Sequence, residues 1–559
     1  MFFLYKMKTK LSLNNETKSL VGCVFMLTTK LAKILLLVTV FALVLCGCSG
    51  NKDESKTPAN DDLSLTELTE AAQSEPTYGG SITVGITQDL DGLDPHKAIS
   101  AGTKEVLFNI FEGLVKFDPD GNLNPAVAEN YHISSDGMVY TFTLRESVKF
   151  HDGSLVSVED VIYSIKRSAG ILEPKDPTVV VESALSVISD VVATDEKMVE
   201  VRLKQVDSEL LPYLTCAIVP KDYDELNTKP IGTGPFKFVS YTPLQSIVLE
   251  KNEEYYLEGV PYLDRVTFKI SSNVDAAFME LQAGAIDILP YITDVHASQL
   301  PKGYHLEAGP MNLIQGLFIN NKVPPFDNKL VRQALCYAVD RQAVIDMVAG
   351  GRGRVIGTNM YPGFKKYYDE SLVNTYPYDP EKAKELLKEA GHPNGFQFTI
   401  TVPSNYQPHI DTAQVIVEQL KQVGITAKIQ LIEWSSWKSV VYKGRNYETT
   451  IVGLAAELAP RETLARFRSD AENNFMNYIN PDYDGLYKQA EIETVEEKKI
   501  QLYKQMQAML TNDAVAVFIQ DPYQMTAVSD KLGGYTHYPI YVQDMSLVYY
   551  KKGTNPINE

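Results

Sequence analysis

The stretch Tyr140-Thr-Phe-Thr-Leu-Arg-Glu-Ser-Val-Lys-Phe-His-Asp-Gly153, followed by Glu159-Asp-Val-Ile-Tyr-Ser-Ile-Lys-Arg167, decides the fold class. Residues 139–144 alternate between apolar and polar types, which predicts a strand with one buried face. His151-Asp-Gly153 predicts a turn, because glycine accepts a positive φ and the aspartate can bond the local backbone. Residues 158–167 have the apolar spacing of a helix. A strand, a turn and a helix in close succession indicate an α/β protein with mixed sheets.

The same two patterns continue along the chain. Further strands are predicted at 78–86, 197–203, 236–239 and 426–431. Further helices are predicted at 326–347, 379–390 and 412–423. The helix at 379–390 has clear ends, because Asp379 suits the N-cap, Pro380 suits the first turn and Gly391 stops the helix.

Composition narrows the class of protein. A chain of 559 residues exceeds the roughly 250–300 at which one hydrophobic core stops growing, so at least two lobes are expected. The formal net charge of -19 repels phosphate groups and argues against a nucleic-acid partner. Cys216 and Cys336 are too few for a disulfide scaffold, and Cys336 lies in an apolar run typical of a core.

Motifs of catalysis and metal binding are missing from the sequence. None of the eight histidines has the His-x-x-His or His-x-x-x-His spacing, so we predict no metal site and no cofactor. The sequence also lacks the hydrolase motifs Gly-x-Ser-x-Gly and His-Glu-x-x-His, and it has no Ser-x-x-Lys accompanied by its companion motifs. We therefore do not predict an enzyme. An exported hydrolase that uses paired carboxylates is the remote alternative.

Residues 1–47 have the pattern of an export signal. Lys30 and Lys33 precede the apolar run 34–45, which is too short for an ordinary membrane-spanning helix. A signal peptide normally opens with its charges, so we hypothesise that translation starts at Met26.

The residues after the apolar run suggest a lipid anchor. Leu45-Cys-Gly-Cys48 resembles a bacterial lipoprotein box, which implies that Cys48 becomes an acylated N-terminus at the outer face of the cell membrane. Two acyl chains anchor a protein stably where one is marginal. The alternative is a plain cleaved signal with incidental cysteines. Residues 48–77 are mostly polar and cannot bury enough surface to fold, so they are predicted to be a disordered tether.

Seven ordered segments, spread from residue 109 to residue 434, resemble the signature of the family 5 extracellular solute-binding proteins. These proteins are the oligopeptide, dipeptide and nickel receptors of ABC importers. The matching segments are the two quoted above together with Asn109–Asp118, Gly232–Phe238, Val331–Arg341, Tyr378–Gly391 and Ile432–Trp434.

The resemblance implies a two-lobe periplasmic-binding-protein-like fold of type II, of the large class with an extra domain inserted in lobe I. The implied boundaries are 78–310 for lobe I with its inserted subdomain, 311–520 for lobe II and 521–559 for the return to lobe I. The strands Leu313–Ile319 and Ala514–Ile519 would cross between the lobes, which places Asn320 and Gln520 near the hinge.

The resemblance also implies a function. The expected protein is a lipid-anchored, monomeric receptor that closes on a peptide, with oligopeptides as the expected ligands, and delivers it to the transmembrane subunits of an ABC permease. A ligand that bridges both lobes favours the closed state by its differential affinity. The alternatives are a nickel chelate, an oligosaccharide or an opine as ligand, and a receptor for a peptide pheromone.

The site residues in lobe II are carried over from the resemblance. Glu457 falls on the aspartate that binds the peptide ammonium in relatives, although Leu454 and Ala459 depart from that motif. The alternative for Glu457 is a solvated helix-cap acid. No arginine is found near Asn405 and Tyr406, where dipeptide receptors clamp the ligand carboxylate, which favours longer peptides.

The remaining site predictions concern Tyr406, Trp434 and the loop 88–96. Tyr406 is a candidate for stacking on the ligand, and Trp434 is either core packing or a wall of the pocket. The loop 88–96 faces the cleft in relatives, so Asp91, Asp94 and His96 are candidate contacts. Asp94-Pro-His96 is equally compatible with a simple turn.

Overall fold

The structure is a computed structural model that describes residues 75–455 and 458–554. The chain divides into two units, Met1–Ala72 and Gln73–Glu559, and only the second is described. The predicted signal, Cys48 and nearly all of the predicted tether lie outside the described residues. The prediction of disorder is wrong for Pro76–Thr77, because these residues form strand β1. β1 pairs with β21 (Tyr549–Lys551), and β21 also pairs with β20 (Leu532–Gly533).

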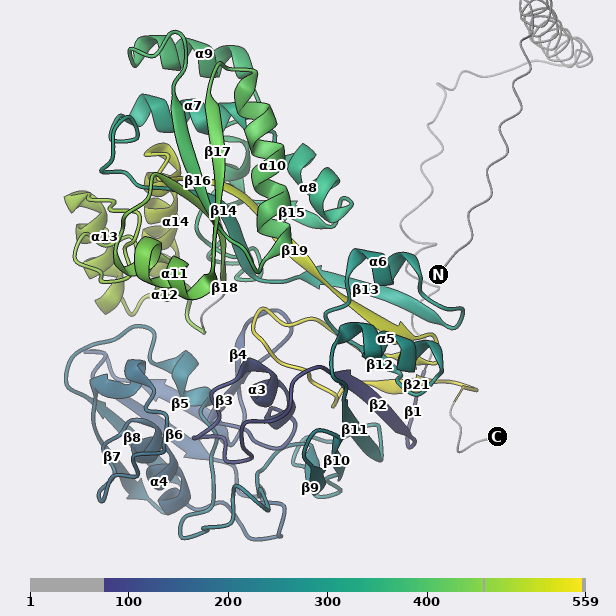
Figure 1. Ribbon diagram of the computed structural model, residues 1–559. Helices are drawn as coiled ribbons and strands as arrows, with labels where there is room; N and C mark the ends of the chain where they lie inside the picture. The colour runs from purple at the N-terminus through teal and green to yellow at the C-terminus, as the bar shows by residue number, and fades with distance from the viewer. Residues whose placement is uncertain (1–74, 456–457, 555–559) are drawn as a thin grey trace, which may run out of the picture. The chain divides into compact units, whose positions relative to one another are not determined.

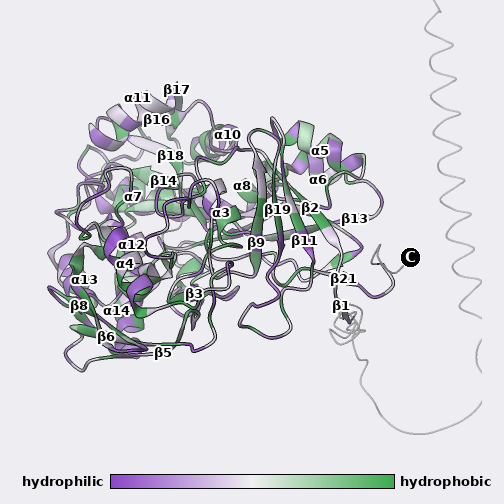
Figure 2. Ribbon diagram, turned by 90° about the horizontal axis from the view of Figure 1, so that it is seen from below, coloured by the Kyte–Doolittle hydropathy of each residue, from purple (hydrophilic) through white to green (hydrophobic). Residues whose placement is uncertain are grey.

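A mixed sheet of twelve strands runs through the second unit. Ten strands follow one another in space: β17 (Thr426–Ile432), β16 (Gln397–Pro403), β18 (Thr449–Ala455), β14 (Leu313–Ile319), β19 (Ala516–Ser529), β12 (Ile288–Leu289), β2 (Ser81–Ile86), β11 (Arg265–Ile270), β10 (Ser246–Lys251) and β9 (Phe236–Thr242). The other two, β13 (Tyr304–Pro310) and β15 (Gly353–Val355), pair with β19. In Figure 2, β2 and β19 are largely green, as expected for strands that are covered on both faces.

The long strand β19 belongs to both lobes. Its first half pairs with β14 and its second half pairs with β13. Figure 1 shows β19, in yellow, passing from the green upper part to the purple and blue lower part. We call the part built on β17, β16, β18, β14 and the first half of β19 lobe II, and the rest lobe I. The two strand crossings between them form the hinge of the fold.

Gln520 lies at this hinge, as predicted. It pairs with Gln315 of β14 and with Val355 of β15. The prediction for Asn320 is wrong, because Asn320 follows the opposite end of the seven-residue β14. There its side-chain Nδ2 donates to the backbone oxygen of Tyr447 at 2.9 Å.

Lobe II has a hydrophobic core on each face of its sheet. Alternate residues of β14 serve the two cores, with Leu317 and Ile319 on one face and Ile314 and Phe318 on the other. The first core is covered by α7 (Lys329–Ala338), α8 (Arg341–Ala349), α9 (Pro380–Glu389) and α10 (Gln407–Lys421). The second is covered by α11 (Trp434–Trp437), α12 (Pro460–Ala465), α13 (Pro481–Ile492) and α14 (Glu496–Asn512).

Two helices occupy the range 326–347, where one was expected. Val339 leaves the helical conformation, with φ -101° and ψ 112°, and the Asp340 side chain then caps α8 by accepting from the backbone N–H of Ala343. Aspartate favours such a cap over a helix interior, which explains the break. The cap of α9 by Asp379 is confirmed, and Cys336 is buried in the core as expected.

Lobe I carries an inserted subdomain with its own core. Its sheet has the order β5 (Ala128–Ile133), β6 (Val139–Leu144), β8 (Met198–Leu203) and β7 (Ile188–Asp195), next to α4 (Val158–Ser168) and the hairpin of β3 (Val115–Phe117) and β4 (Leu123–Pro125). The predicted strand at 139–144 and helix at 158–167 are confirmed. The other helices of lobe I are α3 (Ala101–Leu107), α5 (Val274–Gln282) and α6 (Asp294–Ser298).

Two of the signature segments meet in this lobe, and their role is architectural. Gly153 has φ +88° in the predicted turn, and Asp152 accepts from the backbone N–H of Ser154 at 2.9 Å. The His151 Nε2 donates to the carbonyl of Gly234, and its Nδ1 accepts from the N–H of Gly232. Of the helices in the described part of the chain, none combines the length and apolar character needed to span a membrane.

Candidate functional site

The carboxyl ends of three neighbouring strands of lobe II lie at one edge of the sheet. β16 is parallel to both β17 and β18, so all three strands end on the same side. Asn405 and Tyr406 follow β16, Trp434 follows β17 and Leu458 comes shortly after β18. Ligands of α/β proteins commonly bind at such an edge. Glu457 belongs to the same segment as Leu458 but lies outside the described residues.

The structure brings Tyr406 and Trp434 together, with their ring centroids 5.4 Å apart in an edge-to-face arrangement. Trp434 also stacks on the buried Trp437 at 5.0 Å, and Lys438 lies over its ring. Trp434 therefore contributes to packing. Tyr406 is 41% exposed and Asn405 is an exposed turn residue, so both are open to a ligand at this edge.

His409 lies beneath Tyr406 and connects this edge to the hinge. Its Nε2 accepts from the backbone N–H of Gly453 at 3.1 Å, and its Nδ1 is 2.9 Å from the side-chain amide of Gln315. The Gln520 side chain donates to Gln315 at 2.7 Å. Burial lowers the pKa of His409 to about 4, so the ring is neutral at pH 7.

The predicted contacts in the loop 88–96 of lobe I are engaged with the protein itself. Asp91 accepts from the backbone N–H groups of Ile99 and Ser100 at 2.9 and 2.8 Å, which fixes the start of α3. Asp94 forms a buried bidentate ion pair with Arg167, at 2.6 and 2.9 Å. Asp94 also accepts from the backbone N–H of His96, as in the simple turn that the sequence suggested.

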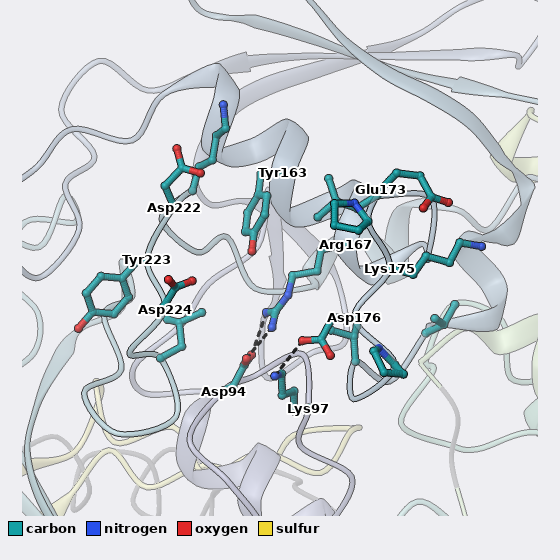
Figure 3. Close-up of a pocket in the computed structure, with 18 residues that line it drawn as sticks. Asp94, Lys97, Tyr163, Arg167, Glu173, Lys175, Asp176, Asp222, Tyr223 and Asp224 are labelled. Atoms are coloured by element: carbon teal, nitrogen blue, oxygen red, sulfur yellow. Dashed lines mark hydrogen bonds and ion pairs between the residues drawn. The ribbon is translucent and has the colours of Figure 1, made fainter.

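His96 uses both of its ring nitrogens inside lobe I. Its Nε2 donates to the carbonyl of Ala217 at 2.8 Å, so its Nδ1 accepts from Arg167 at 3.1 Å. Burial, and then the charge of Arg167, lower the pKa of His96 to about 4. Figure 3 shows the pair of Asp94 and Arg167 at one wall of an 830 Å³ cavity. Lys97 and Asp176, which also line this cavity, form a second ion pair of 2.9 Å beside the first.

Three further cavities meet at Leu458, where lobe II faces lobe I. Their volumes are about 370, 220 and 370 Å³, and Leu458 lines all three. The first two share residues of α3 and its continuation: Lys104, Phe108 and Phe111. The third lies between the inserted subdomain and lobe II, with Tyr131 and Tyr140 on one side and Lys366 and Tyr367 on the other. Residues of lobe I line the first two cavities, to which lobe II contributes Leu458, whereas several residues of each lobe line the third.

Apart from Lys104, the charged groups that line the first and third cavities are paired. Glu112 accepts from Lys116 at 3.0 Å and from the Tyr255 hydroxyl at 2.7 Å. Glu496 accepts from Lys366 and Lys499 at 2.7 and 2.9 Å, which, against the effect of burial, lower its pKa to about 2.

A second contact between the lobes is largely buried. The carboxylate of Glu209, in the inserted subdomain, accepts from the backbone N–H of Arg461 at 3.0 Å and from the Tyr503 hydroxyl. The Arg461 guanidinium donates to Asp207 at 2.8 Å. Glu209 and Arg461 are only 2% and 5% exposed. Ala459 inserts into the core of the subdomain beside them. We call this contact the charged junction.

Sequence reasoning missed most of the cavity lining in lobe I. Phe108 lies just before the Asn109–Asp118 signature segment and Phe111 lies within it. The segment therefore indicates their place in the cavity only indirectly. The loop 540–542 also lines the first cavity, and it carries no local motif. Lys104 had no signal beyond its charge. Within 75–455 and 458–554, His, Cys, Asp and Glu form no group of three that could hold a metal ion.

Known proteins share this architecture. The model of the bacterial extracellular solute-binding proteins, family 5 middle, matches residues 122–475, which is more than half of the chain. Heme-binding protein A of Haemophilus influenzae is 28% identical over 553 residues, covering 91% of this chain and 97% of the relative. The oligopeptide-binding protein AppA of Bacillus subtilis is 28% identical over 541 residues, covering 90% and 96%.

The comparison of structures agrees. The ABC transporter substrate binding protein CtaP of Listeria monocytogenes superimposes with a TM-score of 0.74 at 25% identity, over 85% of this chain and all of that chain. The resemblance that the sequence motifs indicated is therefore confirmed. With its two lobes, its crossing strands and this match, the chain belongs to the family 5 bacterial extracellular solute-binding proteins of ABC importers.

Proposed function

We propose that this protein is a lipid-anchored receptor that captures oligopeptides between its lobes and delivers them to an ABC permease. The observation that carries the proposal is the group of cavities around Leu458, a lobe II residue that faces lobe I in the first two cavities and lines the third together with further residues of both lobes. A ligand that fills them contacts both lobes at once, and such a ligand stabilises the closed state by its extra contacts.

The lining of the cavities supports a peptide as the ligand. Aromatic and aliphatic side chains such as Phe108, Phe111 and Leu458 alternate with charged groups such as Lys104 and Glu112. Peptides of varied sequence present the same mixture of apolar and charged groups. The relative AppA carries the name of an oligopeptide-binding protein.

Heme is the second candidate, because one relative is named heme-binding protein A. Heme iron needs a protein ligand such as a free histidine nitrogen or a thiolate. The cavity histidine, His96, has both nitrogens engaged, and burial raises the pKa of the Cys216 thiol to about 12. These contacts favour a peptide over iron ligation in the described part of the cavities.

For the site we propose that Glu457 binds the ligand ammonium and that Asn405, Tyr406 and Trp434 form the lobe II wall. Glu457 adjoins Leu458, which lines every one of the three cavities. Asp91, Asp94 and His96 are proposed to support the lobe I wall rather than to touch the ligand, because their polar atoms are engaged.

The decisive experiment is native mass spectrometry of the purified protein, followed by identification of the released ligand. We expect co-purified oligopeptides, and a mixed peptide pool should give heat in calorimetry after the captured ligand has been removed by unfolding and refolding. Heme, a nickel chelate, an oligosaccharide or an opine in the released fraction, with no heat from peptides, would overturn the peptide proposal. Steady release of cleaved products would indicate a hydrolase instead.

The lipid anchor is a separate proposal and has its own test. Cys48→Ala should abolish incorporation of a labelled fatty acid and move the protein from the membrane fraction to the medium or periplasm. A matched Cys46→Ala variant should remain in the membrane fraction. Lipidation that survives a stop codon placed before Met26 would support the proposed start, and its loss would refute it.

A further inference from the structure

Lys104 differs from the other lysines of the three cavities around Leu458. It is an exposed residue in the last turn of α3, and it lines both the 370 Å³ cavity that includes Tyr541 and the adjoining 220 Å³ cavity. Figure 1 shows α3 on the side of lobe I that faces lobe II. Among the residues that the structure describes, no carboxylate forms an ion pair with Lys104.

The other three lysines that line the cavities around Leu458 each have a carboxylate partner. Lys116 pairs with Glu112, and Lys366 and Lys499 both pair with Glu496. These pairs are satisfied by the protein and have a structural role. Lys104 is the cation in this set that remains available to a ligand.

The surroundings of Lys104 favour a charge-assisted bond. Phe108 and Phe111 line the same two cavities, and Leu458 from lobe II lines both as well. Apolar walls exclude water when the lobes close, and an ion pair gains strength as the effective dielectric constant falls. The long flexible stem of lysine lets the ammonium follow ligands of different length.

We propose that Lys104 binds a carboxylate of the captured ligand. The inference rests on the proposed function and assigns the anionic end of the ligand to lobe I. Lobe II has no arginine at Ser404–Tyr406 to do so. The C-terminus of a peptide and the propionate of heme share this carboxylate chemistry.

The test compares ligands with and without a free carboxylate on ligand-free protein. One pool contains defined three- to five-residue peptides with free C-termini, and a second contains the same peptides with amidated C-termini. Hemin and hemin dimethyl ester form the corresponding pair for heme. The variants are Lys104→Met, Lys104→Arg and the control Lys388→Met, which removes an exposed lysine from the last turn of α9, far along the chain from the cavities.

Wild type and Lys388→Met should bind the free acids at least tenfold more tightly than the amides or esters. Lys104→Met should lose that preference and bind both forms equally, and Lys104→Arg should keep most of it. A preference that survives in Lys104→Met, or equal binding of both forms by wild type, would overturn the role of Lys104 and leave the peptide function intact. Binding of neither pair of ligands by wild type would overturn both proposals.

Discussion

Arg461 and Lys104 are both cations where the two lobes meet, and their surroundings are opposite. Arg461 lies in the charged junction, 5% exposed, with Asp207 as a direct partner and Glu209 against its backbone. Lys104 lies at cavities of about 370 and 220 Å³, and the described residues give it no ion pair. The carboxylates of the first contact have partners within the protein. At the second, the cavities have room for a ligand, and the ammonium of Lys104 is available to pair with it.

This difference suggests how the two lobes divide their tasks. The charged junction attaches the inserted subdomain to helices α12 to α14 of lobe II, while the hinge strands connect the rest of lobe I. A ligand that fills the cavities therefore binds between two lobes that are already joined by the charged junction. We expect substitutions at the charged junction to change stability and substitutions at the cavities to change ligand binding.

The largest effect is expected for Arg461→Met. Removing the guanidinium leaves Asp207 and the buried Glu209 without their main positive partner, and breaking a buried ion pair in this way typically costs about 3–5 kcal/mol. Urea unfolding of the full-length variant measures this loss. Adding Glu209→Gln to Arg461→Met should recover part of it, because the uncompensated carboxylate is then gone. A loss below about 1 kcal/mol would contradict the assignment of the junction as a buried, satisfied contact.

The second prediction concerns the pH dependence at His409, beneath the exposed Tyr406. Burial lowers the pKa of His409 to about 4 in the folded protein, below the usual value of about 6.5 of the unfolded chain. Between these values the unfolded state binds the proton, so this residue's contribution to stability is lost as the pH falls. Wild type should lose about 2 kcal/mol more than His409→Gln between pH 7.5 and pH 5.

Urea unfolding of both proteins at several pH values provides the measurement. The comparison with the variant is needed because buried acids change stability in the opposite direction over the same range. The pKa of Asp521, for example, is raised to about 7 by burial. Parallel curves for wild type and His409→Gln would contradict the prediction.

Local patterns predicted the elements of both lobes well, because their causes are local. The strand at 139–144 needs only its alternation, and α9 needs only Asp379, Pro380 and Gly391. The seven signature segments added the two-lobe architecture and the crossing strands. The break between α7 and α8 was missed, because an apolar spacing that continues across Val339 hides the cap at Asp340.

The site was harder to predict, because its partners are distant in sequence. Arg167, 73 positions later in the sequence, forms an ion pair with Asp94. This candidate ligand contact is therefore a structural ion pair. The Asn109 side chain bonds the carbonyl of Gln543, 434 positions later, next to the loop that lines the first cavity. No local pattern records such contacts. Tyr406 and Trp434 were predicted as separate candidates, and they lie together because the parallel strands β16 and β17 end at the same edge of the sheet.

The third prediction tests Tyr406, the exposed ring of the lobe II edge. Tyr406→Ala should weaken binding of the peptide pool about fivefold, which corresponds to about 1 kcal/mol for one aromatic contact. Its effect on the free energy of unfolding should stay within about 1.5 kcal/mol, because the ring is exposed but packs edge-to-face on Trp434. Calorimetry and urea unfolding check the two quantities. Tyr378→Ala, at a similarly exposed tyrosine that contacts Gln422 at the other end of α10, is the matched control and should change neither by more than that.

The smallest effect is expected for the stability of Lys104→Met, and it returns to the comparison with Arg461. An exposed lysine without an ion pair contributes almost nothing to folding, so the free energy of unfolding should change by less than about 0.5 kcal/mol. Arg461→Met, six to ten times more costly, serves as the reference in the same urea experiment. A loss above about 1 kcal/mol in Lys104→Met would show that this lysine has a structural partner in the ligand-free protein. Stability and ligand preference would then have the same origin, and the division between a satisfied junction and an available cation would no longer hold.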